Sequence, residues 1–567
     1  MKNAEIAKTL NQIADILEMK NIQWKPIAYK KAARTIQTLS KPIEKIYEKE
    51  GFKGLEKIPG VGKSIAKHIE EYLKTGKIKK YEQLRKKIPK GVEEIMHIQG
   101  MGPKKAIKLY KKLRIKNTKE LEQAAKQGKL RKIPGFGEKS EQEILRGLQI
   151  TKQIRERHTI NTVMEAAREI VQQLKKIPEV ERLEIAGSLR RMKETIRDMD
   201  LLVVSKKPEQ VMNAFTKLAE KKQILAKGPT KSTIVLKQGL QADLRVVERK
   251  NFGAAYMYFT GSKDHNVHLR KIAKKQKYKL SEYGLFKRNK FICGKTEKEI
   301  YKKLGFEWIP PELRENRGEL DVKKLPKIVS YNEIKGDMQT HTKWSDGANT
   351  INEMAEQCEK MGYEYIIITD HSKSQHIAGG MNEKKLEKYL KEIEKIQKKR
   401  KIKIIKGSEV DILKDGTLDY SNKILKKLDY VLAAVHSGFK NTKEAMTKRV
   451  LKAMDNPYVN TIAHPTGRII GKREPYAIDL DRIFEKAKER QIAMDIDSFP
   501  TRLDLNDINI KRGLEFGVKF AISTDAHSTD HLRFMEYGIG QARRGWATAK
   551  DIINTLPYAK LRKYLQR

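Results

Sequence analysis

The apolar residues follow a helical period at the N-terminal end of the chain and form short runs further along. Ile6, Leu10 and Ile13 are separated by four and three residues, which predicts an amphipathic helix, and similar spacing continues to residue 155. Residues 156–250 combine a helical stretch at Val163–Leu174 with apolar runs of strand length, such as Leu201–Val204. Further strands are expected at 183–186, 234–237 and 242–247, and a further helix at 209–221. The pattern predicts an all-α region followed by an α+β domain.

From Gly336 onward, short apolar runs alternate with helical stretches. The runs lie at 365–369, 402–406, 430–434, 461–463, 492–496 and 520–523. Strands that alternate with helices in this way favour a parallel-stranded α/β barrel or a barrel-like domain. A smaller mixed segment and a stretch with prolines and scattered charges precede it. We therefore divide the chain at residues 1–80, 81–155, 156–250, 251–315, 316–333 (a linker) and 334–567.

The net charge of the chain indicates what kind of partner it binds. Lys and Arg number 120 against 72 Asp and Glu, a formal net charge of +48. Such an excess favours a polyanionic partner, with nucleic acid first and an acidic membrane surface second. The sequence contains no run of about 18 apolar residues, the length needed to span a bilayer. Its first residues lack the apolar core of a signal peptide. The two cysteines, Cys293 and Cys358, exclude a disulfide scaffold and a thiolate zinc cluster. We expect a soluble, cytoplasmic protein.

One short motif occurs three times in the helical region. It reads IPGVG at 58–62, IQGMG at 98–102 and IPGFG at 133–137, and a helical stretch follows each copy. Glycines permit a tight turn, and the N–H groups at the start of a helix can hold a phosphate without reading a base. One copy alone would usually be a simple turn, but three copies in a basic region favour binding to the DNA backbone. The predicted DNA-binding glycines are Gly60, Gly62, Gly100, Gly102, Gly135 and Gly137.

Three aspartates form the clearest catalytic candidate. Asp198 and Asp200 are two residues apart just before an apolar strand, so both side chains should point to one face, and Asp243 lies near the start of another strand. A lone Asp-x-Asp would more often be a solvated strand edge. Three carboxylates together can hold two Mg²⁺ ions that activate a hydroxyl and neutralise a polyphosphate. The Gly187-Ser188 turn upstream, with Arg190 and Arg191 after it, is suited to holding phosphates.

Histidines and carboxylates gather in the C-terminal domain, mostly just after apolar runs. Residues at the carboxyl ends of barrel strands converge on one mouth, where nitrogen and oxygen ligands suit Zn²⁺, Mn²⁺ or iron and could activate water against a phosphodiester. The predicted ligands are His341, Asp346, His371, Glu409, His436, His464, Asp525 and His527. Asp411, His376 and His531 lie near these motifs but are not predicted as ligands; we expect them to support the ligands or to lie on the surface. A working nuclease site, a weakened site and a structural remnant all remain open.

These motifs together resemble a known family. A Gly-Ser turn followed by an acidic pair is the nucleotidyltransferase signature, and with the hairpins and YFTGS at Tyr258–Ser262 the chain looks like a family X DNA polymerase. The resemblance implies a palm in which Asp198, Asp200 and Asp243 bind metal and Asp243 helps to deprotonate the primer 3′-hydroxyl. It implies a thumb-like, nucleotide-selecting segment at 251–315. The nucleotide-binding residues it implies are Arg157, Gly187, Ser188, Arg191, Tyr258, Phe259, Gly261, Asn266 and Arg270.

The first 80 residues resemble the small lyase domain of that family, an 8-kDa-like domain that binds DNA ends. Lys25, Tyr29 and Lys30 occupy the positions that bind a 5′-phosphate. The position of the Schiff-base lysine holds His68, which cannot form a stable imine, and that of a second lysine holds Ser64. Lys63 and Lys67 are nearby, but we expect weak or absent lyase activity. The resemblance also implies that hairpin carbonyls bind Na⁺ or K⁺, near Ile58, Val61, Ile98 and Met101.

The order of the C-terminal motifs resembles the PHP (polymerase and histidinol phosphatase) domain, which is joined to family X polymerases in bacteria and archaea. It implies a metal-dependent 3′–5′ exonuclease, with Mn²⁺ or Zn²⁺ as the metal. One position departs from the family pattern: the usual His-x-His begins here with Gln339, and a neutral amide is a poor ligand for a transition metal.

We therefore expect a monomeric, Mg²⁺-dependent DNA polymerase that fills short gaps in base excision repair and uses deoxynucleoside triphosphates on gapped or primer-template DNA. The expected fold combines an all-α helix-hairpin-helix region, an α+β nucleotidyltransferase palm with a small α+β thumb, and an α/β barrel-like PHP domain. A repair nuclease with a polymerase-like body and a non-catalytic DNA scaffold are the alternatives. A membrane-surface role has the charge but lacks an apolar anchor.

Overall fold

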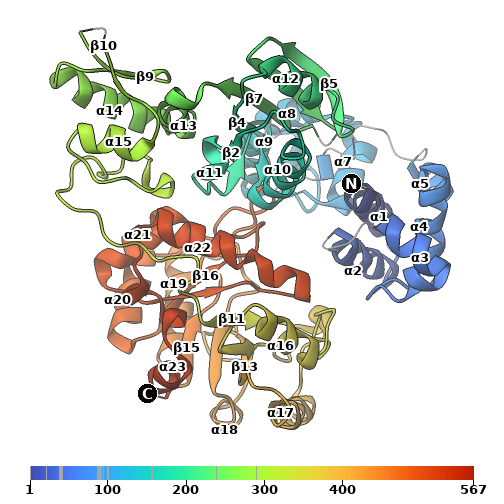
Figure 1. Ribbon diagram of the computed structural model, residues 1–567. Coiled ribbons are helices and arrows are strands. Elements are labelled where there is room, and N and C mark those ends of the chain that lie inside the picture. The colour runs from blue at the N-terminus through green and yellow to red at the C-terminus, as the bar shows by residue number, and fades with distance from the viewer. Residues whose placement is uncertain are drawn as a thin grey trace.

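The computed structural model describes residues 2–20, 22–37, 43–85, 92, 95–96, 98, 101–154, 157–237, 239–288 and 290–566 (Figure 1). The predicted combination of helical hairpin domains, an α+β polymerase body and a barrel-like domain is confirmed. Within the described residues, no helix is both long and apolar enough to cross a membrane. Of the predicted DNA-binding glycines, Gly100 lies outside the described residues.

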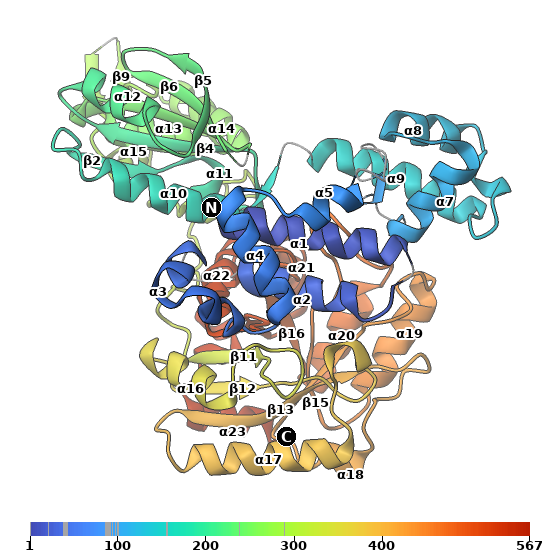
Figure 2. The same ribbon diagram turned by 90° about the vertical axis from the view of Figure 1, so that its right-hand side faces the viewer.

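The N-terminal region is helical and contains two separate apolar cores. One extends from Ile6 to Tyr81 and the other from Val92 to Leu148. The helices are α1 (Lys2–Met19), α2 (Lys25–Gln37), α3 (Ile43–Glu56), α4 (Lys63–Thr75), α5 (Lys79–Arg85), α7 (Pro103–Leu113), α8 (Thr118–Lys126) and α9 (Glu138–Ile154). Figure 2 shows α7, α8 and α9 at the same edge of the molecule as the barrel helix α19 (Lys443–Met454). Glu143 of α9 lies 3.3 Å from Lys440 just before that helix, so the two regions touch through opposite charges.

The palm is a five-stranded sheet in the order β2-β4-β7-β6-β5, backed by helices α10 (Ile160–Leu174) and α12 (Pro208–Thr216). Its strands are β2 (Arg182–Ile185), β4 (Asp198–Val204), β5 (Lys221–Lys227), β6 (Lys231–Leu236) and β7 (Gln241–Val247). Two details differ from the sequence-based expectation. The strand at Leu201–Val204 already begins at Asp198, and β5, an exposed edge strand, starts where the predicted helix was to end.

The thumb follows the palm as helices α13 (Phe252–Thr260), α14 (Lys263–Lys275) and α15 (Glu297–Lys303) around a small antiparallel sheet. The strands of that sheet are β8 (Lys279–Ser281), β9 (Gly284–Lys287) and β10 (Lys290–Cys293). Residues 316–333, predicted as a linker, connect the thumb to the C-terminal domain but are packed along much of their length. Leu320 and Ile328 belong to the thumb core, whereas Val329 belongs to the core of the next domain.

The C-terminal domain contains seven parallel strands that are neighbours in chain order. They are β11 (Gly336–Thr340), β12 (Tyr365–Ile368), β13 (Lys403–Asp411), β14 (Tyr430–Ala434), β15 (Val459–Ile462), β16 (Ala493–Asp497) and β17 (Phe520–Ser523). The main helices between and after them are α16 (Ile351–Lys360), α17 (Glu383–Gln397), α19, α20 (Leu480–Arg490), α21 (Asp507–Phe516), α22 (Met535–Arg544) and α23 (Tyr558–Leu565). A parallel bridge joins Thr340 to Ala526, so the sheet curls until its first and last strands meet. The barrel-like prediction is thus confirmed.

The barrel and the palm share one apolar core. Leu503, Phe534 and Tyr537 of the barrel are buried in the cluster that also contains the palm strands. Polar contacts flank this core: Gln541 donates to the carbonyl of Met192 at 2.8 Å, and Arg544 donates to Glu315 at 2.8 Å. The palm therefore rests on the barrel through ordered, buried contacts.

Leu503→Ala is expected to destabilise the joined palm and barrel. Leu503 is fully buried, so truncation removes apolar contacts and leaves a cavity, which typically costs about 2–5 kcal/mol. We expect a clear fall in the midpoint of urea unfolding. The matched control is Leu225→Ala, because the Leu225 side chain is 51% exposed and its loss should change the midpoint little. Equal effects of the two changes would contradict the shared core.

Candidate active sites

The three palm aspartates meet on one face of the sheet. Strands β4 and β7 are parallel neighbours, and their register pairs Asp200 directly with Asp243. Asp198 is two residues before Asp200 on the same strand, so it points to the same face. Thr233 donates a short hydrogen bond to Asp243, and Gln241 donates to its other oxygen at 3.1 Å. The arrangement concentrates three carboxylates where divalent cations would neutralise them.

The close approach of these carboxylates affects the pKa of Asp200. Burial raises the pKa of Asp200 to about 7, and the charges of Asp198 and Asp243 add to the shift. Without a cation, one carboxyl of the cluster is therefore largely protonated below neutral pH. These ligands fit Mg²⁺, which prefers carboxylate oxygens.

This pKa predicts how the Mg²⁺ requirement depends on pH. Below about pH 7 the cation must displace a proton from Asp200, whereas above it the carboxylate is already ionised. The Mg²⁺ concentration that gives half-maximal nucleotide addition should therefore fall as the pH rises from about 6 to about 8, and level off above the pKa. Mg²⁺ titrations on a gapped primer at several pH values measure this. A requirement that does not change with pH would contradict the assigned cluster.

Glycine is required where the chain leaves β2 and passes the carboxylates. Gly187 has φ +64°, and a Cβ atom there would lie 2.2 Å from Oδ2 of Asp200. The preceding N–H, of Ala186, donates to the Asp200 carbonyl at 2.8 Å. The expected turn is one turn of helix, α11 (Gly187–Arg190), in which the half-buried Ser188 directly follows the glycine that contacts Asp200.

The arginines expected near the phosphates already have protein partners. Arg190 forms a two-pronged pair with Glu297 at 2.8 and 2.7 Å and lies over the ring of Tyr256. Arg191 donates to Glu315 at 2.9 Å and is almost fully buried. Arg190 thus joins the palm to the thumb. A triphosphate contact by Arg191 stays a prediction, as does one by Arg157, which donates to the Thr195 hydroxyl at 2.9 Å.

The structure brings several of the implied nucleotide-binding residues of the thumb together. Tyr258, Asn266 and Arg270 line one small hollow, and the Asn266 amide donates to the Tyr258 carbonyl at 2.7 Å. Phe259 packs edge-on against Tyr258, with ring centres 5.1 Å apart, and the Arg245 guanidinium covers its ring. Gly261, with φ +70°, ends the helix that carries these aromatic residues.

The hairpin turns share one hydrogen-bond pattern. The N–H of Val61 donates to Ile58 at 2.9 Å, that of Met101 to Ile98 at 3.0 Å, and that of Phe136 to Ile133 at 2.9 Å. A helix begins directly after each turn, at Lys63, Pro103 and Glu138. Gly60, Gly102 and Gly135 have positive φ, while Gly62 and Gly137 each accept the first hydrogen bond of the helix that follows. The predicted sequence of a tight turn followed by a helix is confirmed, whereas DNA binding by these glycines stays a prediction.

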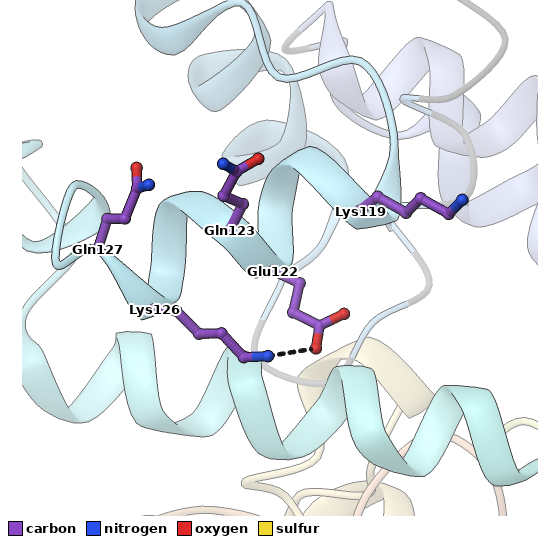
Figure 3. Close-up of a pocket in the computed structure, with 5 residues that line it drawn as sticks. All are labelled: Lys119, Glu122, Gln123, Lys126 and Gln127. Carbon is purple, nitrogen blue, oxygen red and sulfur yellow. Dashed lines mark ion pairs between the residues drawn. The ribbon is translucent and has the colours of Figure 1, made fainter.

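The outer face of α8 has a shallow depression (Figure 3). It is lined by Lys119, Glu122, Gln123, Lys126 and Gln127, and Glu122 lies 3.0 Å from Lys126. None of these residues was predicted for binding or catalysis, and the depression is lined by a single exposed helix.

The N-terminal domain places Tyr29 against His68. The Tyr29 hydroxyl lies 3.0 Å from Nδ1 of His68, and burial lowers the pKa of that histidine. Lys25 is exposed, and Lys30 pairs with Glu18 at 2.7 Å. Lys63 and Lys67 are both exposed. The tyrosine expected to bind a phosphate thus has a histidine as its neighbour where the family has a lysine.

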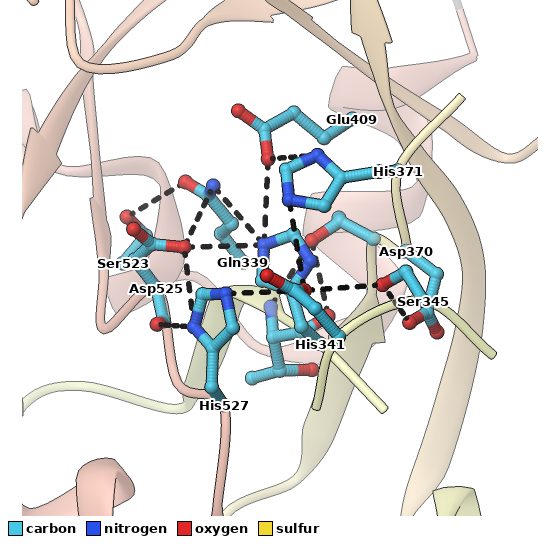
Figure 4. Close-up of polar contacts among 12 residues, drawn as sticks. Gln339, His341, Ser345, Asp370, His371, Glu409, Ser523, Asp525 and His527 are labelled. Atoms are coloured by element: carbon cyan, nitrogen blue, oxygen red, sulfur yellow. Dashed lines mark hydrogen bonds and ion pairs between the residues drawn. The ribbon is translucent and has the colours of Figure 1, made fainter. Parts of the chain in front are cut away.

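The eight predicted ligands of the barrel lie toward the carboxyl ends of its strands or in the loops that follow them. Figure 4 labels five of them, His341, His371, Glu409, Asp525 and His527. His341, His371, His436 and His464 follow β11, β12, β14 and β15, Glu409 is on β13, and Asp525 and His527 follow β17. The structure groups most of them into three overlapping sets with ligand atoms within 4.8 Å of one another. The sets are His341, Asp346, His371 and His527; His371, Glu409 and His436; and His341, Glu409 and Asp525. His464 lies 2.9 Å from Glu409 and so adjoins the second set.

Glu409 is the centre of this site. It is buried, and its oxygens lie 3.2 Å from His371, 3.2 Å from His436 and 2.9 Å from His464. Burial would raise its pKa, but the neighbouring histidines outweigh burial and hold the pKa well below its ordinary value. Burial also disfavours the charged form of His341 and would lower its pKa. The neighbouring carboxylates of Asp525 and Glu409 outweigh burial and raise this pKa to about 10. Ionised carboxylates surrounded by imidazoles fit a transition-metal site, in which the cation would replace these protons.

Asp411, His376 and His531 were expected to support the ligands or to lie on the surface. Asp411 forms a short hydrogen bond with Nδ1 of His436, and His531 accepts from the N–H of His527 at 3.1 Å, so both orient predicted ligands. His376 is exposed. Arg502 lies 3.4 Å from Asp525 and had no signal in the sequence, because it is brought there by a loop.

Comparisons with known proteins agree with this architecture. Family models match residues 1–78 (helix-hairpin-helix domain), 92–151 (SAM-like helix-hairpin-helix tandem), 255–315 (DNA polymerase beta thumb) and 337–499 (PHP domain). Together with the palm, these regions define the class: a polymerase of the beta type joined to a PHP domain.

Relatives define the family more closely. The "DNA polymerase/3'-5' exonuclease PolX" of Bacillus subtilis (strain 168) is 35% identical over the full length of both chains. A probable phosphatase of Thermoanaerobacter sp. (strain X514) is 31% identical over 41% of this chain and 94% of its own. The "Repair DNA polymerase X" of African swine fever virus is 32% identical over 23% of this chain and 78% of its own. The chain belongs to the PolX family, the family X DNA polymerases that carry a PHP domain.

Proposed function

We propose that this chain fills short gaps in DNA during base excision repair and removes nucleotides from 3′ ends with its PHP domain. The observation that carries the first activity is the meeting of Asp198, Asp200 and Asp243 beside the Gly187 turn. The second is supported by the cluster around Glu409 and by the printed name of the Bacillus relative. Gapped or primer-template DNA and deoxynucleoside triphosphates are the proposed substrates, and one chain supplies both sites.

Residues of the palm and the thumb have proposed roles in nucleotide addition. Asp198, Asp200 and Asp243 hold Mg²⁺, which when bound neutralises the triphosphate and makes the primer hydroxyl more acidic. Asp243 assists removal of the proton from the primer 3′-hydroxyl. Ser188 and the N–H groups of its turn bind triphosphate oxygens. Tyr258 and Phe259 form a wall beside the sugar, which excludes a 2′-hydroxyl, while Asn266 and Arg270 contact the base and the template.

The barrel is proposed to hydrolyse the terminal phosphodiester. Its histidines and carboxylates hold Mn²⁺ or Zn²⁺, which when bound supplies an activated water. Asp411 and His531 fix the orientation of His436 and His527 through the contacts described above. The three hairpins bind the DNA backbone in both reactions, and the net charge of +48 attracts it. Carbonyl groups of the first two hairpin turns bind Na⁺ or K⁺. Because His68 stands at the nucleophile position, we do not propose lyase activity.

One assay tests both proposed activities. A duplex with a one-nucleotide gap, labelled on the primer, is incubated with Mg²⁺ and the complementary nucleotide, and separately with Mn²⁺ and no nucleotide. The proposal predicts template-directed extension in the first mixture and shortening from the 3′ end in the second. DNA binding without either reaction would favour the non-catalytic scaffold, and shortening without extension would favour the nuclease.

A further inference from the structure

Gln339 stands inside the ligand cluster of the barrel, at the third of its three sets. That set contains His341, Glu409 and Asp525. The inference drawn from it rests on the proposed metal-dependent function of the barrel and concerns how many ions the barrel holds. All three sets consist of imidazole and carboxylate groups, and the first and second sets fit a cation. The third set has a different environment.

The amide of Gln339 is turned with its hydrogens toward the third set. Gln339 is fully buried, its Nε2 lies 3.3 Å from Oδ1 of Asp525 and 3.5 Å from Nε2 of His341, and its carbonyl oxygen lies 3.4 Å from the Ser523 hydroxyl (Figure 4). An amide nitrogen is a donor and has no lone pair to offer a metal. The side chain thus uses the ligand atom of Asp525 as a hydrogen-bond acceptor, and its own oxygen points to a hydroxyl.

A fixed positive charge covers the other oxygen of Asp525. Nε of Arg502 lies 3.4 Å from Oδ2 of Asp525 and 3.4 Å from Oδ2 of Asp497, and the Arg502 side chain is only 20% exposed. Its backbone is held in place, because Arg468 donates to the Arg502 carbonyl at 2.8 Å and the next residue, Leu503, is buried in the core shared with the palm. The backbone that carries this guanidinium is therefore fixed by the contact between the domains, and its side chain lies between the carboxylates of Asp497 and Asp525.

The contacts of Asp525 decide what the third set can bind. Its Oδ1 faces Gln339 and His341, which lies 3.1 Å away, and its Oδ2 faces Arg502. A divalent cation there would have only three protein ligands, because Gln339 offers its NH₂ group in place of a fourth. It would also lie close to the Arg502 guanidinium, which repels it. We propose that the PHP domain of this chain binds two divalent ions, at the first and second sets, and that Arg502 with the Gln339 amide takes the place of an ion at the third.

Counting the bound ions tests this inference without any activity measurement. The full chain, with Asp198→Asn and Asp243→Asn to remove the palm site, is saturated with Mn²⁺ and freed of excess by gel filtration. Bound manganese is then measured by elemental analysis and native mass spectrometry. We expect two ions per chain. The double change Gln339→His with Arg502→Ala should raise the count to three, whereas the control Gln339→Leu should leave it at two.

The possible counts separate this inference from the proposed function. Three ions in the chain with native Gln339 and Arg502 would overturn the inference while leaving a metal-dependent nuclease intact. Fewer than two would overturn both. The count for the native barrel residues decides the matter even where the double change prevents folding, and the melting temperature reports whether each variant is folded. A folded double variant that still binds two ions would also overturn the inference.

Discussion

Asp243→Asn is expected to reduce nucleotide addition by about 10³-fold, with little change in folding. Asp243 is paired with Asp200 across two parallel strands, so its charge is needed to hold a cation between them. Asparagine keeps the size of the side chain and can still accept the hydrogen bond from Thr233, but it carries no charge. Single-turnover insertion of one nucleotide into a gapped duplex measures the effect.

The same preparation supplies the control for this change. Exonuclease activity should be unaffected, because the barrel ligands are on other strands. Glu209→Gln removes a carboxylate from an exposed position on the palm helix α12 and should leave insertion within about twofold. Insertion by Asp243→Asn at more than about a tenth of the normal rate would mean that the carboxylates are not the metal ligands.

Glu409→Gln is expected to reduce 3′–5′ exonuclease activity by about 10³-fold. The Glu409 carboxylate contacts histidines from several strands and belongs to two of the three ligand sets. An amide would lose the charge that attracts the cation, and its NH₂ group would face imidazole nitrogens. Release of the 3′-terminal nucleotide from labelled single-stranded DNA in Mn²⁺ measures the loss.

The control for the barrel is a carboxylate of the same type on its outer surface. Glu387→Gln on α17 removes an exposed ion pair with Lys427 and should leave both reactions unchanged. Gap filling by Glu409→Gln should also remain near normal in Mg²⁺. If Glu409→Gln and Glu387→Gln lose equal, small amounts of exonuclease activity, the barrel cluster is not the site of hydrolysis.

Sequence reasoning was most informative where local chemistry and spacing decide the structure. The hairpin glycines are required by their own turns, and the three aspartates are positioned by strand geometry. The strand that carries Glu409, however, was expected to be shorter, since its polar residues Glu409 and Asp411 interrupt the apolar pattern although both lie within β13. Edge strand β5 was not predicted because its residues are almost all exposed and therefore show no alternation.

Contacts between distant segments could not be predicted in this way. Arg191, whose triphosphate contact stays a prediction, pairs with Glu315, which also accepts from Arg544 of the barrel. Arg502 reaches Asp525 only because a loop after β16 returns to the mouth of the barrel. Such pairs form through tertiary packing, and neither periodicity nor a motif records them.

Locating the metal ions at the palm would test directly whether the three aspartates form the polymerase site. Crystals of the chain with gapped DNA, a non-hydrolysable nucleoside triphosphate and Mn²⁺ would be measured at the manganese absorption edge. We expect anomalous peaks from manganese bound by oxygens of Asp198, Asp200 and Asp243, next to the triphosphate. A triphosphate bound elsewhere, or a map with no peak between these three carboxylates, would contradict this assignment.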